Sequence, residues 1–120
     1  MNAIANAMVG LVGLLHVYIL VLEMFLWTRP LGLRTFRNSF DKATDSAVLA
    51  ANQGLYNGFL AAGLFWGLAQ GDPGFGFKVK TFFLLCVIVA GIYGAATVSR
   101  RILFVQAAPA AVALLLLWLA

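Results

Sequence analysis

The chain has 120 residues, of which 63% are hydrophobic and only 10% are charged, with a formal net charge of +4. In soluble domains about a quarter of the residues are charged, because the surface must be largely polar. This composition excludes a soluble enzyme domain, a disordered tail and a disulfide framework. It indicates an integral membrane protein.

Four stretches contain no charged residue: 1–22, 46–71, 81–99 and 102–120. Each meets or approaches the length of about 20 residues that a helix needs to cross a bilayer. Backbone groups in lipid must be paired internally, so these runs become helices. We therefore predict an all-α membrane protein, with residues 1–120 forming a single domain. Its four transmembrane helices, at about 3–27, 47–69, 80–99 and 102–120, are expected to form one bundle.

The basic residues lie in the breaks between the apolar runs, as membrane topology requires, and this placement argues against nucleic-acid binding. Arg29, Arg34, Arg37 and Lys42 fall in the first loop, and Arg100 and Arg101 in the third. Only Lys78 and Lys80 lie in or beside the second loop. The positive-inside rule then places loops one and three in the cytoplasm and both termini outside.

The connections carry their own signals. Pro30 can open a short helix lying in the membrane interface, and an irregular connection is the alternative. Asp45 or Ser46 is the expected N-cap of the second span. Residues 70–77 are dense in turn formers and predict a tight external connection.

Ionisable side chains at membrane depth are costly and usually functional. His16 and Glu23 are seven residues apart, which places them on one helix face about 10 Å apart. Glu23 is interpreted as a proton- or cation-binding carboxylate inside the bundle, or as an interfacial partner of a loop arginine. His16 is a titrating group or a structural hydrogen-bonding group.

The other three spans add polar groups in the same, cytoplasmic half. Asn52 is expected at the depth of Glu23, and Asn57 at that of His16. Pro109 removes the hydrogen bond to the carbonyl of Val105. Together these groups predict a polar pocket, or else hydrogen bonds that only hold helices together. The predicted pocket consists of His16, Glu23, Asn52, Gln53, Tyr56, Asn57, Tyr93, Thr97 and Gln106.

Small residues recur at spacings that let helices approach closely. Gly54, Gly58 and Ala62 form one such run, and Gly91, Ala95 and Ser99 another. They predict tight packing of the second and third spans, or of two copies of the chain. The single histidine, the single cysteine and the one intramembrane carboxylate have no metal-ligand spacing, so we expect neither metal nor cofactor.

Four segments carry a resemblance to a known family: His16–Met24, Ala51–Gly63, Ala90–Thr97 and Leu103–Gln106. They resemble the small bacterial integral membrane proteins grouped as domain of unknown function 1304. The resemblance spans nearly the whole chain and implies a multi-pass, four-helix protein of the bacterial inner membrane. It implies no reaction.

The residues favour a carrier or channel for a small solute, using an intramembrane site with a carboxylate and a histidine. Its expected partners are the lipid bilayer, an unidentified small molecule and a second copy of the chain. The alternatives are a membrane enzyme on a lipid or quinone-like substrate, with Glu23 and His16 as acid and base, and a non-catalytic scaffold. A non-enzymatic role is favoured over an enzyme.

Overall fold

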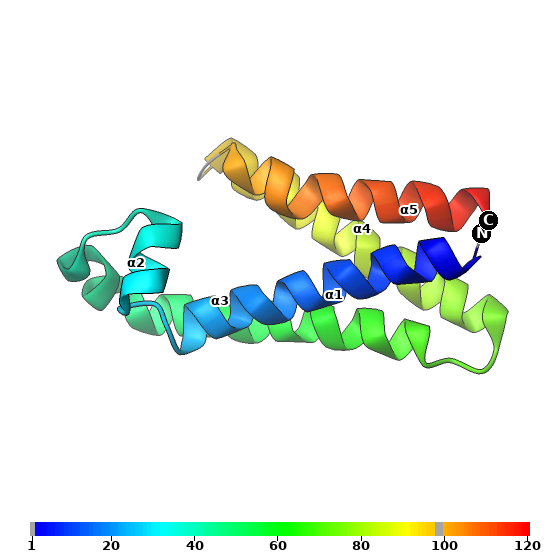
Figure 1. Cartoon of the computed structure of the whole chain (residues 1–120), viewed down its shortest axis with the longest axis horizontal. Helices are drawn as coiled ribbons and strands as arrows, with labels where there is room; N and C mark the ends of the chain where they lie inside the picture. Colours follow the sequence, from blue (N-terminus) through cyan, green and yellow to red (C-terminus); the bar gives the residue numbers. More distant parts are fainter. Residues whose placement is uncertain (1, 98–99) are drawn as a thin grey trace. The chain divides into compact units, whose positions relative to one another are not determined.

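The computed structural model describes residues 2–97 and 100–120, and all of its regular elements there are helices (Figure 1). The helices are α1 (Asn2–Met24), α2 (Pro30–Phe36), α3 (Phe40–Leu68), α4 (Pro73–Thr97), the π-helix η1 (Leu103–Ala107) and α5 (Ala108–Leu119). The predicted all-helical class is confirmed. The arrangement of four transmembrane helices in one bundle stays a prediction.

Two helices are long and apolar enough to cross a membrane. They are Ala3–Met24, with 22 residues, and Pro73–Thr97, with 25 residues, and Phe104–Leu119 is a shorter apolar segment. The helix α3 is longer, at 29 residues, but the amides of Asn52, Gln53 and Asn57 make its middle more polar.

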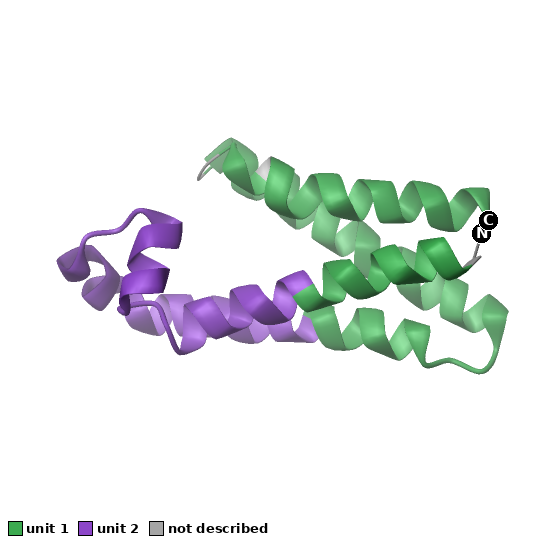
Figure 2. Cartoon of the chain, in the orientation of Figure 1, with its two compact units in different colours: residues 1–14, 60–120 green, residues 15–59 purple. Residues whose placement is uncertain are grey.

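The chain divides into two compact units (Figure 2). Unit 1 comprises the residues up to Leu14 together with Leu60–Ala120, and unit 2 comprises Leu15–Phe59. The core of unit 1 draws on α1, α3, α4 and α5. Its buried members are Ala5, Val9, Val12, Leu64, Leu84, Val87, Ala110, Ala113 and Leu117.

In unit 2, α2 and the turns on either side of it connect α1 to α3. The indole N–H of Trp27 donates a hydrogen bond to the hydroxyl of Ser46 at 3.1 Å, and its ring lies 4.7 Å from that of Phe36. Gly32 lies against the backbone carbonyl of Leu26, so closely that a Cβ at this position would overlap it. The predicted helix at Pro30 is confirmed, with proline in its first turn. Its placement in the membrane interface stays a prediction.

The helix starts differ from the predicted ones. Asp45 and Ser46 lie inside α3, because the helix begins earlier, at Phe40. The N-cap is Ser39, whose hydroxyl accepts a hydrogen bond from the backbone N–H of Lys42 at 3.2 Å. The capping oxygen satisfies an N–H that has no partner inside the helix, so the helix can start in polar sequence.

The second connection is also shorter than predicted, because α4 begins at Pro73 and takes in most of residues 70–77. The carboxylate of Asp72 accepts a hydrogen bond from the backbone N–H of Gly74 at 3.0 Å. Proline in the first turn, preceded by a capping aspartate, is a strong helix start. Ser99, which ends both the predicted third span and the second run of small residues, lies outside the described residues.

The predicted fourth span is not a continuous α-helix. It contains the π-helix η1, followed by α5, with Pro109 in the first turn of α5. Because Pro109 has no N–H, the ordinary bond to the carbonyl of Val105 cannot form, and the wider turn occurs at this break.

Gly54 and Gly58 of α3 pack against α1 within unit 2, which corrects the predicted pairing of the second and third spans at these two positions. A Cβ on Gly54 would lie 2.6 Å from Cγ of Met24, and one on Gly58 would lie 2.7 Å from Cδ1 of Leu20. Ala62, the third member of the predicted run, is exposed. In unit 1, Gly91 packs against Ala107 of η1, while Ala95 is half-buried.

We predict that Gly54→Leu lowers the free energy of unfolding by about 1–3 kcal/mol, because the added atoms would push α1 and α3 apart. Thermal unfolding of the purified protein in detergent measures this. Ala62→Leu is the matched control, since the same helix exposes Ala62, and it should unfold like the wild type. Equal unfolding temperatures for Gly54→Leu and the wild type would contradict the close contact.

Candidate functional site

His16 and Glu23 of α1 are both buried. His16 is 0% exposed and Glu23 is 7% exposed, and they are the buried polar or charged side chains that the described residues contain. Such groups are rarely buried without a hydrogen-bonding partner. Among the described residues, no buried side-chain nitrogen or oxygen lacks such a partner.

The carboxylate of Glu23 is held by an amide from the neighbouring helix. Nδ2 of Asn57, on α3, donates a hydrogen bond to Oε1 of Glu23 at 2.6 Å, entirely within unit 2. The backbone approach at Gly54 brings the two side chains within reach, since a Cβ there would lie 3.2 Å from Cβ of Glu23. The site is thus a buried acid with a neutral amide partner.

The expected depth match between Asn52 and Glu23 is therefore wrong by more than one helical turn. Depths counted from the predicted span ends paired Asn52 with Glu23, and Asn57 with His16. Instead, the glycine contacts set the register of α1 against α3 in unit 2, and this register places Asn57 beside Glu23.

The remaining predicted pocket residues are more open. Asn52, Gln53 and Tyr56 are exposed on α3. In unit 1, Tyr93 and Thr97 are exposed, and the hydroxyl of Thr97 donates to the carbonyl of Tyr93 in its own helix at 2.7 Å. Gln106 is half-buried in η1. A pocket that includes all of these residues stays a prediction.

Sequence reasoning missed a second polar pair, in unit 1. Nζ of Lys80, on α4, donates a hydrogen bond to Oδ1 of Asn6, on α1, at 2.8 Å. The charge pattern alone places Lys80 in or beside the second loop. The signal that could have found it is Pro73, since a helix that starts there has Lys80 about two turns inside.

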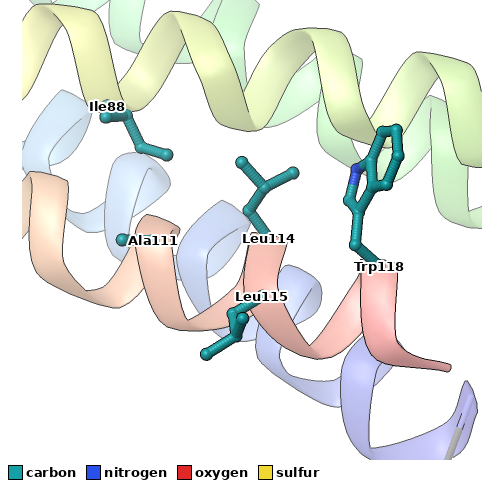
Figure 3. A pocket seen from close by; sticks show the side chains of 5 residues that line it. All are labelled: Ile88, Ala111, Leu114, Leu115 and Trp118. Carbon is teal, nitrogen blue, oxygen red and sulfur yellow. The ribbon is translucent and has the colours of Figure 1, made fainter.

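A hollow between α4 and α5 offers no comparable chemistry. It has a volume of about 360 Å³ and is lined by Ile88, Ala111, Leu114, Leu115 and Trp118. In Figure 3, Leu114 and Trp118 extend from α5 toward α4, and Ile88 extends from α4 toward α5. The indole N–H of Trp118 donates to the hydroxyl of Thr81 at 3.2 Å, which leaves an apolar lining suited to hydrocarbon.

Among the described residues, no group of three or more His, Cys, Asp or Glu side chains could hold a metal ion. Cys86 is half-buried and is not part of a disulfide. The candidate site is therefore the buried acid Glu23 together with its hydrogen-bonding partner Asn57.

Residues 10–118 match the family described as "Protein of unknown function (DUF1304)". The chain belongs to this family. A relative, "Uncharacterized protein YpaA" of Lactococcus lactis subsp. lactis (strain IL1403), is 29% identical over 107 residues, which cover 88% of each chain. No solved structure gives a significant match. The resemblance seen in the sequence is confirmed, and the family description assigns no activity.

We predict that Asn57→Leu destabilises this family member by about 1–3 kcal/mol or more, because it leaves the buried carboxylate of Glu23 without its donor. Asn52→Leu makes the same chemical change at an exposed position of the same helix and should leave stability nearly unchanged. Thermal unfolding in one detergent compares the two. Equal losses would show that the Glu23–Asn57 hydrogen bond contributes little.

Proposed function

We propose that this family member is a multi-pass protein of the bacterial inner membrane that carries a small solute, with Glu23 as the proton- or cation-binding group. One observation carries the proposal: Glu23 is 7% exposed within a helix long and apolar enough to span a membrane, and an amide is its partner. Intramembrane carboxylates are costly and mark ion and proton pathways in transporters.

The neutral partner supports this reading over a structural ion pair. The amide of Asn57 donates through Nδ2 to an ionised carboxylate, as it does here at 2.6 Å. After rotation of the amide, its oxygen can accept a hydrogen bond from a protonated acid. Glu23 can therefore keep a partner in both charge states, as a group that gains and loses a proton during transport requires.

The proposed topology rests on the placement of the basic residues. The exposed side chains of Arg29, Arg34, Arg37 and Lys42 gather around α2 and the start of α3, and Arg100 and Arg101 are exposed before η1. Under the positive-inside rule, both regions lie on the cytoplasmic side and both termini lie outside.

Cysteine labelling tests this orientation. In a Cys86→Ala background, Ser39→Cys should be protected from a membrane-impermeant maleimide in intact cells, and Gly74→Cys should react. Both positions are exposed in the structure, so protection of Ser39→Cys reports the membrane rather than the fold. Reaction of both cysteines from outside would contradict the single orientation.

Proton movement tests the role of Glu23. In liposomes with a trapped pH-sensitive dye and an imposed potassium diffusion potential, we expect the wild type to move protons faster than empty liposomes. Glu23→Gln should fall to the rate of empty liposomes, because glutamine can still accept from Asn57 but cannot ionise. The fold should be kept, which thermal unfolding verifies.

Asp45→Asn is the matched control for this experiment. It removes one carboxylate from an exposed position of unit 2, so its proton flux should equal that of the wild type. A wild-type flux no greater than that of empty liposomes, or an unchanged flux in Glu23→Gln, would contradict the proposal. A wild-type flux no greater than that of empty liposomes, together with destabilisation by Asn57→Leu, would instead favour the scaffold.

A further inference from the structure

A lysine lies inside an apolar helix of unit 1. Lys80 is on α4, about two turns after Pro73, and its ammonium donates one hydrogen bond to Asn6 at 2.8 Å. An ammonium carries three N–H donors, and the amide oxygen of asparagine is neutral. Asn6 therefore orients the ammonium without neutralising its charge.

Within unit 1, the single acidic side chain of the sequence, Asp72, already has a partner. The four Asp and Glu residues are Glu23, Asp41, Asp45 and Asp72, and the first three belong to unit 2. Asp72 belongs to unit 1, where its carboxylate accepts a hydrogen bond from the backbone N–H of Gly74 at the start of α4. A cation in an apolar setting is stabilised best by an anion, which a bound molecule can supply here.

Lys80 and Asn6 line a pocket of about 400 Å³. The pocket exists where the backbones of α3 and α4 approach closely, since a Cβ on Gly76 would lie 3.0 Å from the carbonyl oxygen of Gly67. The stem of Lys80 passes over Gly67, where an added Cβ would lie 2.6 Å from Cγ of Lys80. Besides Lys80 and Asn6, the lining includes the amide of Gln70, the apolar side chains of Leu68, Phe77 and Leu117, and Ala120.

We propose that this pocket binds an amphiphilic anion, with a carboxylate or phosphate on Lys80 and Asn6 and a hydrocarbon portion against the apolar side chains. A charged group beside an apolar wall matches such a molecule better than a small inorganic anion, which would leave the apolar wall uncovered. The site lies in unit 1 and is independent of the role proposed for Glu23.

The test is a binding titration of the purified full chain in a non-ionic detergent. The probes are decanoate, a short-chain phosphatidylglycerol and inorganic phosphate, and the readouts are tryptophan fluorescence and native mass spectrometry. The ring of Trp118 lies 5.0 Å from that of Phe77, which lines the pocket, so an occupied pocket should change the fluorescence. We expect both amphiphiles to bind more tightly than inorganic phosphate.

Lys80→Gln should raise the Kd of both amphiphiles about tenfold or more, because it removes a charge-assisted hydrogen bond. Lys78→Gln is the matched control. It makes the same charge change on the same helix, but Lys78 is exposed and does not line the pocket, so its Kd should stay close to that of the wild type. Asn6→Leu, which keeps the net charge, should also weaken binding.

The outcomes separate the sources of the anion. Binding of phosphatidylglycerol alone would support the site with a membrane lipid as its occupant, and binding of decanoate as well would support amphiphilic anions in general. Equal losses in Lys78→Gln and Lys80→Gln, or inorganic phosphate binding as tightly as the amphiphiles, would overturn the proposal. If Lys80→Gln fails to fold, unchanged binding in Asn6→Leu would overturn it.

Discussion

The close approach of two helix backbones at Gly54 and Gly58 fixes the register on which the acid site depends. Side chains at these positions would meet Leu20, Glu23 and Met24 of α1. In lipid, helices gain little from burying apolar side chains against each other, so association relies on close packing and interhelical hydrogen bonds. Unit 2 uses both, because the glycine contact brings the amide of Asn57 to the carboxylate of Glu23.

Two of the interhelical hydrogen bonds among the described residues follow one pattern. In each, an ionisable group on one helix meets an asparagine of another: Glu23 with Asn57 in unit 2, and Lys80 with Asn6 in unit 1. An asparagine can orient a charge without cancelling it, whereas a buried ion pair would fix both charges in place. Each asparagine thus holds the ionisable group in place and leaves its charge uncancelled.

The long helices could be predicted because each apolar run is long and uninterrupted. The short helix α2 could be predicted from Pro30, which lies in its first turn. The starts of α3 and α4 were missed, because Ser39 and Asp72 cap helices that begin in polar sequence, before the apolar runs. The burial of Glu23 was one of two interpretations that the sequence allowed, the other being an interfacial partner of a loop arginine. The partner of Glu23 could not be predicted, because the register between two helices is decided by glycine contacts, which a count of membrane depth does not contain.

The π-helix η1 influences which face of α5 is turned toward α4. A π turn holds one residue more than an α turn, and each residue of an α-helix advances the side chains by roughly 100°. Converting Leu103–Ala107 to ordinary α-helix would therefore rotate every side chain of α5 relative to the residues before η1. The wider turn thus absorbs one extra residue, and a chain that lacked this residue and was α-helical here would present the same face of α5 to α4.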